Sequence, residues 1–365
     1  MLSEFAFVIH ATDLKLMSIA FDEPGIIKKN RSLVEKAFSW FPPFKCAHIE
    51  GLRSRTGKTS EGDLIFCTLT PEQFLTMEPD FLLNRIVEAG RLAIDLGAKI
   101  LGLGAYTAFV GRKGLQVAKA LDMPVTTGSS YTAATAVEAT LKAAVDTGMS
   151  LDEIRASVVG ATGTIGSICS QLISKKIRAI NLVARNLPRL ENLSKRIKGK
   201  NETAKIIIST DINSISESDI VVCVTNDPSA IIDINTLKSG SVVCDISIPK
   251  NISEENAAAR KDILVIDGGI VKLPGDVEFN FYFGLPHSHA YACMAETMIL
   301  ALEERYESYS IGGNITIEKV EEITRLASKH GFRLAELKSF GVAVSEERME
   351  SFKYYSRAKA ICGRI

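Results

Sequence analysis

The chain has 365 residues, which is enough for two domains with well-packed cores. Its 43 lysines and arginines balance 43 aspartates and glutamates, so the charge gives no indication of a nucleic-acid or membrane-surface partner. No apolar run is long enough for a stable membrane span, and the first residues lack the basic segment of a targeting signal. Seven cysteines without a C-x-x-C pair argue against a disulfide scaffold or a zinc site. We therefore expect a cytoplasmic protein without a metal.

The first 150 residues predict a mixed α/β domain. Apolar runs bounded by turn residues predict strands at 5–10, 65–69, 100–109 and 121–125, the third running into a glycine-bearing turn. Apolar residues near helical spacing predict helices at 80–96 and 131–146, which end at Gly97 and Gly148. We place the first domain boundary near Ser150, where the second of these helices gives way to a different pattern.

Residues 157–166 are the stretch around which the chain is organised, with the sequence Ser-Val-Val-Gly-Ala-Thr-Gly-Thr-Ile-Gly. A strand at 154–159 precedes the glycines, and a helix at 165–175 follows them. This arrangement is typical of a dinucleotide site, in which bare backbone and a helix N-terminus face a pyrophosphate. The candidate cofactor residues are Gly160, Thr162, Gly163, Thr164, Ile165 and Gly166. A glycine-rich turn without a ligand is the alternative.

Arg185 indicates which dinucleotide the site binds. It follows a second predicted strand at 180–184, about twenty residues beyond the glycines, where an NAD site usually has an acidic residue. An arginine at this position can pair with a 2′-phosphate, so we expect NADP(H), and specifically NADPH as the reductant. The alternative is a surface arginine without a ligand.

The following residues continue the alternation of strand and helix. Further strands are predicted at 206–209, 219–224, 242–246 and 263–266. Such alternation predicts an α/β fold with a doubly wound parallel sheet of the Rossmann type. Ligands bind beyond the carboxyl ends of these strands, where we expect Thr225, Ser247, Gly268 and Gly269 to contact the cofactor. Ordinary loop residues would produce the same pattern.

Cys293 is the cysteine with suggestive neighbours. It follows Pro286 in the run His-Ser-His-Ala-Tyr-Ala-Cys, and an apolar helix extends beyond it to about residue 306. With Ser288 as the N-cap, Cys293 would lie in the first turns of that helix, where the dipole and the imidazoles of His287 and His289 would lower its pKa. A thiolate there is a candidate nucleophile. A packed structural cysteine is equally compatible with these residues alone.

An ordered set of short segments resembles the cyanobacterial long-chain acyl-acyl-carrier-protein reductases, which make fatty aldehydes with NADPH. The segments are Ser54–Lys58, Thr126–Gly128 with Thr132 and Ala133, Val158–Gly163 with Ile165–Ser167, Ala184–Asn186, Thr236–Lys238, Pro249–Asn251, Gly268–Gly269, Ala292–Cys293 with Ala295–Glu296, Ile315–Lys319 and His330–Phe332. They cover most of the chain, to about Leu337. The chain departs from the family at Ser129, Tyr131, Asp245–Ser247, His287 and His289, and it has a charged tail after Gly341.

The resemblance implies reduction of a long-chain acyl thioester to an aldehyde, with the family's acylated cysteine at Cys293. The partner would be an acyl carrier protein or a CoA thioester, and an enzyme that consumes the aldehyde is a further conceivable partner. We expect an N-terminal α/β acyl-binding domain (1–150), a Rossmann NADP(H) domain (151–285) and a C-terminal helical region carrying Cys293 (286–365). A fatty chain requires an apolar tunnel in the first domain. The candidate substrate residues are Tyr106, Phe109, Thr127, Gly128 and Ser129.

Three alternatives share an NADP-binding domain. Shikimate- or quinate-type dehydrogenases need a lysine–aspartate pair that acts on a hydroxyl, and no nucleophilic cysteine. Glutamyl-tRNA reductases need an N-terminal cysteine and a basic surface for tRNA, and neither is evident here. A non-catalytic NADP-binding sensor would not require Cys293 at a helix start.

Overall fold

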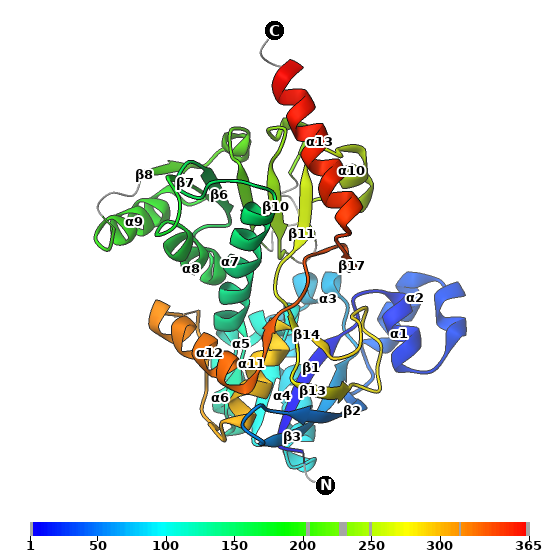
Figure 1. Cartoon of the computed structure of the whole chain (residues 1–365). Coiled ribbons are helices and arrows are strands. Elements are labelled where there is room, and N and C mark those ends of the chain that lie inside the picture. Colours follow the sequence, from blue (N-terminus) through cyan, green and yellow to red (C-terminus); the bar gives the residue numbers. More distant parts are fainter. Residues whose placement is uncertain (1–2, 202–204, 226–231, 248–249, 314, 363–365) are drawn as a thin grey trace. The chain divides into compact units, whose positions relative to one another are not determined.

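The computed structural model describes residues 3–201, 205–225, 232–247, 250–313 and 315–362, with side chains to residue 355. The chain forms two compact units (Figure 1). The first contains Met1–Tyr131 and Val271–Arg333, and the second contains Thr132–Ile270 and Leu334–Ile365. These divisions differ from the expected limits at 150 and 285, which remain predictions. The first unit is therefore built from two segments that are far apart in the sequence.

The first unit is organised around a six-stranded sheet with the order β13-β2-β3-β1-β4-β5. The strands are β1 (Phe5–His10), β2 (Phe44–Arg53), β3 (Thr59–Cys67), β4 (Ile100–Leu103), β5 (Val125–Thr126) and β13 (Gly275–Glu278). Strand β1 lies parallel to both β3 and β4, and β4 lies parallel to β5. Strands β2 and β13 form an antiparallel edge.

Helices cover both faces of this sheet. They are α1 (Leu14–Ala20), α2 (Arg31–Phe38), α3 (Pro71–Thr76), α4 (Pro79–Asp95), α5 (Val110–Lys113), α6 (Leu115–Leu121), α11 (Ala292–Leu302) and α12 (Ile317–His330), with 3-10 turns η1 (Pro24–Lys28) and η2 (Ala105–Phe109). Side chains alternate along a strand, so Leu101 and Leu103 pack with Ile86 of α4, whereas Gly102 between them faces α11. A Cβ on Gly102 would lie 2.2 Å from Thr297 Oγ1, so glycine permits the close approach of α11.

The second unit contains the predicted doubly wound sheet. Its strands are β6 (Arg155–Val159), β7 (Ala179–Val183), β8 (Lys205–Ser209), β9 (Ile220–Cys223), β10 (Val242–Asp245), β11 (Leu264–Asp267), β16 (Lys338–Ser339) and β17 (Val342–Ala343). The sheet order is β17-β16-β11-β10-β9-β6-β7-β8. The six strands from β6 to β11 are parallel and have the 3-2-1-4-5-6 order of a Rossmann sheet. The predicted fold class is confirmed.

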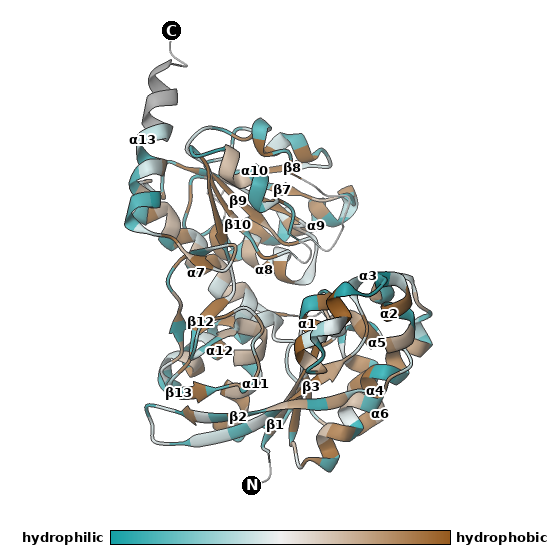
Figure 2. Ribbon diagram, turned by 90° about the vertical axis from the view of Figure 1, so that its right-hand side faces the viewer, coloured by the Kyte–Doolittle hydropathy of each residue, from teal (hydrophilic) through white to brown (hydrophobic). Residues whose placement is uncertain are grey.

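The remaining elements complete the two units. They are the helices α7 (Ser129–Asp146), α8 (Thr164–Ile173), α9 (Leu187–Lys198), α10 (Glu254–Ala259) and α13 (Glu346–Cys362), the 3-10 turns η3 (Ile212–Ile215) and η4 (Ile234–Thr236), and a small sheet of β14 (His289–Tyr291), β12 (Ile270–Lys272) and β15 (Arg333–Leu334). Apolar residues concentrate in the strands of each sheet (Figure 2). In the second unit, Val159, Val221 and Val243 of neighbouring strands form part of one buried cluster.

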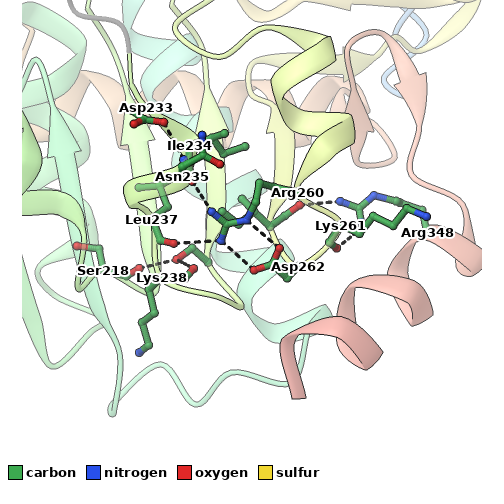
Figure 3. Close-up of polar contacts among 12 residues, drawn as sticks. Ser218, Asp233, Ile234, Asn235, Leu237, Lys238, Arg260, Lys261, Asp262 and Arg348 are labelled. Carbon is green, nitrogen blue, oxygen red and sulfur yellow. Dashed lines mark hydrogen bonds and ion pairs between the residues drawn. The ribbon is translucent and has the colours of Figure 1, made fainter. Parts of the chain in front are cut away.

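The last helix is attached to the second unit by an arginine. The guanidinium of Arg348 on α13 donates to the carbonyl oxygens of Lys261 (2.9 Å) and Ile263 (2.6 Å), which precede β11. Arg260 beside them forms a two-point contact with Asp262 at 2.9 and 2.8 Å (Figure 3). These guanidinium contacts act together with the buried ring of Phe352 on α13, which explains why the charged C-terminal sequence forms a docked helix.

The strand predicted at 121–125 is only partly present. Leu121 is the last residue of α6, and Val125 is the residue of the predicted range that belongs to a strand, the two-residue β5. The reason is packing: Leu121 lies so close to α4 that a Cβ on Gly90 would be 2.1 Å from Leu121 Cδ1. A glycine on one helix thus receives a leucine from the other, which the sequence of the segment alone does not reveal.

Candidate functional site

The glycine loop lies between β6 and α8 in the second unit. Gly160 has φ of +83°, and a Cβ there would lie 2.6 Å from the carbonyl oxygen of Val224. A Cβ on Gly166 would lie 2.2 Å from the carbonyl oxygen of Gly160. Gly163 caps α8 without a side-chain hydrogen bond. The loop is therefore restricted to glycine at its turns, and the start of α8 offers backbone N–H groups to an anion.

The other proposed cofactor residues follow the carboxyl ends of neighbouring strands in the same sheet. Arg185 is exposed just beyond β7, and Thr162, Thr164 and Ile165 are partly exposed at the loop and the start of α8. Thr225 follows β9, and its backbone N–H donates to Ser247 Oγ beyond β10 at 3.3 Å. Gly268 and Gly269 follow β11, with φ of +77° at Gly269. The residues that the sequence assigned to this sheet edge lie there.

Asp245 is a residue of this edge to which the sequence analysis gave no role beyond a departure from the family. Its side chain is fully buried at the end of β10 and accepts hydrogen bonds from the backbone N–H groups of Ser247 (2.9 Å) and Asn251 (2.7 Å). The neighbouring Asp267 pairs with Lys250 at 2.9 Å. Asp245 therefore holds the ends of the loop beyond β10. A carboxylate at the end of an apolar strand was the available signal.

Cys293 is the second residue of α11 in the first unit. The other ten residues of α11 are all buried, whereas Cys293 is partly exposed. A Cβ on Gly128 would lie 2.1 Å from Cys293 Cα, and one on Gly104 would lie 3.5 Å from Cys293 Sγ. Two glycine backbones thus flank the cysteine, and no larger residue at 128 would fit without a shift.

The predicted helix cap and the predicted thiol pKa are both corrected. Helix α11 begins at Ala292 with Tyr291 as its N-cap, and Ser288 Oγ instead accepts a hydrogen bond from Val277 N at 3.0 Å. Burial raises the pKa of the Cys293 thiol to about 12, and the nearby carboxyl of Glu296 adds to this rise. Hydrogen bonds with the backbone at Met294, Cys293 and Ala105 favour the thiolate without offsetting burial.

The two nearby histidines have partners of their own. His287 Nε2 pairs with Asp276 at 2.6 Å, and His289 Nδ1 lies 2.8 Å from the carbonyl oxygen of His287. The interaction with Asp276 is the largest cause of a raised pKa at His287. The groups that change the pKa of Cys293 are Glu296 and nearby backbone, together with burial, and neither imidazole is one of them.

The candidate substrate residues belong to two segments that contact Cys293, one that begins at Gly104 and one around Gly128. Thr127 Oγ1 donates to the carbonyl oxygen of Ser310 at 2.5 Å and lies 2.8 Å from Ser129 Oγ, on either side of Gly128. Tyr106 follows Ala105 directly and is buried, and its Oη has no hydrogen-bond partner among the described residues. Phe109, whose ring centroid is 6.4 Å from that of Tyr106, is 46% exposed. A buried phenol without a partner is a candidate contact for a substrate oxygen.

The family of Shikimate / quinate 5-dehydrogenase matches residues 142–267, which lie mainly in the second unit. Aminotransferase PigE of a Serratia strain is 29% identical over 83% of this chain, which spans only 36% of that protein. A long-chain acyl-(acyl-carrier-protein) reductase of Synechococcus elongatus is 29% identical over 77% of this chain and 84% of its own length. Glutamyl-tRNA reductase of Methanococcus aeolicus is 33% identical over 27% of this chain and 25% of its own.

These similarities, with the Rossmann sheet, support an NADP-dependent oxidoreductase, and the prediction of NADP as the cofactor is confirmed. Within the described ranges, no helix is long and apolar enough to cross a bilayer. The acyl-thioester substrate, the individual site residues and the cytoplasmic location remain predictions.

Proposed function

We propose that the protein reduces a long-chain acyl thioester to a fatty aldehyde through an acyl group on Cys293. The Cys293 thiolate would attack the thioester carbonyl carbon, and the C–S bond to the carrier would break as the carrier thiolate leaves and takes up a proton. NADPH, when bound, supplies the hydride that reduces the new thioester at Cys293. Cleavage of the bond to Cys293 Sγ then releases the aldehyde and restores the thiolate.

The observation that carries this proposal is the position of Cys293 between two bare backbones. Gly104 and Gly128 have no side chains, so two backbone segments approach the start of α11 closely and hold Cys293 between them. The N–H groups at the start of α11 are suited to stabilise the negative oxygen of a tetrahedral intermediate. The similarity to the Synechococcus reductase, which extends over most of both chains, supports the same substrate class. The carrier is proposed as an acyl carrier protein or CoA.

The cofactor role belongs to the second unit in this proposal. The backbone of Gly160–Gly166 and the start of α8 would bind the pyrophosphate, and Arg185 the 2′-phosphate. Thr225, Ser247, Gly268 and Gly269 would contact the nicotinamide half. Because none of these residues belongs to the Cys293 segment, a change at Cys293 should leave NADPH binding intact.

The direct test is trapping of the acyl group. We expect that incubation of the wild-type chain with palmitoyl-CoA or palmitoyl-acyl carrier protein, without NADPH, adds the acyl mass to the peptide containing Cys293. NADPH should then release the aldehyde. Cys46→Ser is the matched control, because Cys46 is the other partly exposed cysteine among those described. Cys293→Ser should abolish both adduct and aldehyde, and Cys46→Ser should retain both. Turnover by wild type without an adduct would contradict the proposal.

The dehydrogenase alternative rests on the match of residues 142–267 to the Shikimate / quinate 5-dehydrogenase family. That match lies outside the segments that surround Cys293, so it bears on the cofactor half only. An enzyme of that type would oxidise a hydroxyl with NADP⁺ and would tolerate Cys293→Ser. The same variant and an assay with shikimate or quinate therefore distinguish the two functions.

A further inference from the structure

Glu296 is a fully buried carboxyl one helical turn beyond Cys293 on α11. Its Oε1 accepts a hydrogen bond from Thr126 Oγ1 at 2.5 Å, and its Oε2 accepts one from the backbone N–H of Tyr131 at 2.8 Å. Both partners belong to the segment from Thr126 to Tyr131, which links β5 to α7. No ion pair of Glu296 occurs within the described part of the chain. Burying a carboxyl costs free energy. The hydrogen bonds from Thr126 and Tyr131 offset part of that cost, and they join Glu296 to this segment.

The same segment contains the glycine that covers Cys293. Gly128 has φ of +68°, and a Cβ there would overlap Cα and Cβ of Cys293 at 2.1 and 2.3 Å. The backbone N–H of Gly128 donates to Thr126 Oγ1 at 3.3 Å. The Thr126 hydroxyl therefore accepts from Gly128 while it donates to Glu296, as one hydroxyl can. A continuous set of contacts runs from the Glu296 carboxyl through Thr126 to the backbone that lies on Cys293.

A second set of contacts fixes the far end of the segment. Ser130 N donates to Ser310 Oγ at 3.2 Å, and Ser310 Oγ donates to Ser130 Oγ at 2.7 Å. Ser310 also interacts with the Glu296 carboxyl. The turn around Gly128 is therefore tied to α11 at Thr126, at Ser130 through Ser310, and at Tyr131.

We infer that Glu296 is a positioning residue, whose carboxyl holds the Thr126–Tyr131 segment in place so that Gly128 lies against Cys293. It does not touch the substrate in this role. It acts through Thr126, so the hydroxyl of Thr126 is a positioning group as well. The expected effect of Glu296 on turnover rests on the proposed function. Its effect on the reactivity of the Cys293 thiol does not depend on the substrate.

Charge gives Glu296 a second effect that can be measured. Burial is the largest cause of the raised pKa of the Cys293 thiol, and the charge of the Glu296 carboxyl raises it further. The groups that face Glu296 itself are Lys319 of α12, which favours its ionised form, and the phenol of Tyr309. Burial opposes that ionised form by raising the pKa of Glu296. Removing the carboxyl should therefore make the thiol easier to deprotonate even as the segment loosens.

Three variants separate positioning from packing. Thr126→Val keeps the shape and the Glu296 charge but removes the hydroxyl link, and Thr126→Ser keeps the link. Glu296→Gln removes the charge. For each, the rate of Cys293 alkylation by iodoacetamide is followed against pH by mass spectrometry of its peptide. The rate of aldehyde formation from palmitoyl-CoA and NADPH is measured at saturating substrate, and thermal unfolding verifies folding.

For Thr126→Val we expect an unchanged pH midpoint of alkylation, a limiting rate several-fold above wild type, and a loss of turnover on the order of a hundredfold. Thr126→Ser should behave as wild type in both assays. Glu296→Gln should shift the alkylation midpoint to lower pH and lose turnover. If Glu296→Gln does not fold, Thr126→Val decides alone.

The inference is overturned if Thr126→Val alkylates and turns over as wild type does. Failure of the proposed function is recognised separately, because the wild-type chain would then form no aldehyde. In that case the alkylation profiles alone still support positioning if they differ among the variants as stated, and refute it if they coincide.

Discussion

The hydroxyl oxygen of Ser54 lies 2.7 Å from Nδ1 of His330, a residue 276 positions later in the chain. His330 Nε2 contacts Glu303 at 2.5 Å, so a buried imidazole connects the turn after β2 to the ends of α11 and α12. Burial is the largest cause of a lowered pKa at His330, which favours the neutral ring. The neutral ring can donate from Nε2 to the carboxylate and accept at Nδ1 from Ser54.

Ser54→Ala should lower the free energy of unfolding by about 1–3 kcal/mol, because it leaves a buried imidazole nitrogen unpaired. Ser60→Ala is the matched control: Ser60 is equally buried on β3, but its Oγ has no hydrogen-bond partner in the described ranges. That exchange should be neutral or stabilising. Urea unfolding of both variants measures the difference, and equal losses would refute a specific role of the Ser54–His330 contact.

Gly128→Ala should destabilise the first unit more than an ordinary glycine exchange does. Its Cβ would meet the Cys293 backbone, whereas Gly57, also at positive φ (+87°), has open space around its Cβ. Both variants incur the left-handed backbone cost of about 1–2 kcal/mol, and only Gly128→Ala adds a collision. Thermal unfolding should show a clearly larger loss for Gly128→Ala. Similar losses at the two positions would mean that the segment moves away easily.

His10 should make the protein less stable in acid. Burial lowers its pKa from 6.5 to about 4, so between these values the unfolded chain binds a proton that the folded chain does not. Stability from this group is complete above pH 6.5 and falls by about 2–3 kcal/mol as the pH drops to 4.5. His10→Gln should make the fall in urea midpoint from pH 7 to pH 4.5 smaller.

The control for this pH dependence is His287→Gln. The pKa of exposed His287 is raised, chiefly by its hydrogen bond with Asp276, so it stabilises the folded chain on the acidic side. Its removal should leave the acid-induced fall unchanged or make it steeper. A smaller fall in this variant, or an unchanged one in His10→Gln, would contradict the assignment.

Arg185→Ala should weaken NADPH binding on the order of tenfold to a hundredfold and leave NADH binding nearly unchanged, because only NADPH carries the 2′-phosphate. Fluorescence titration with each cofactor measures the two dissociation constants. Arg189→Ala, four residues later at another exposed position on α9, is the control for general loss of positive charge. Equal losses for NADPH and NADH would show that Arg185 does not distinguish them.

Lys338→Met should stabilise the second unit by about 1–3 kcal/mol. Lys338 is 4% exposed, and its ammonium has no hydrogen-bond partner among the residues described. Burial lowers its pKa, so wild-type stability should rise with pH as the folded chain releases this proton before the unfolded chain does. The variant should lack that rise. Lys250→Met, which breaks the ion pair with Asp267, should instead destabilise in the same urea assay.

The sequence predicted the Rossmann half well because its parallel strands are short apolar runs between turns, most of them buried. For example, the predicted strand at 242–246 corresponds to β10, and 206–209 to β8. It failed where tertiary contacts determine the structure. Strand β2, with an irregular pattern of burial and register shifts against β3, was not predicted, and the strand predicted at 121–125 began at the last residue of α6.

The candidate site was predictable only in part, for physical reasons. Cys293 was found from its neighbours, but its raised pKa depends on burial, which the local sequence does not show. Glu296 was noted only within a matching segment, because a carboxyl in an apolar helix has no sequence pattern that identifies its partners. Thr126 and Tyr131 lie more than 160 residues away from it, and only the folded first unit brings them together.

The split composition of the first unit has a consequence for biosynthesis. Residues up to Tyr131 leave the ribosome first, but α11 follows only after all of Thr132–Ile270 has been made. The parallel sheet of the second unit can therefore form while the face of β1 and β4 that receives α11 is still uncovered. Cys293, the nucleophile of the proposed function, is therefore translated only after the whole of the parallel sheet to which that proposal assigns the cofactor.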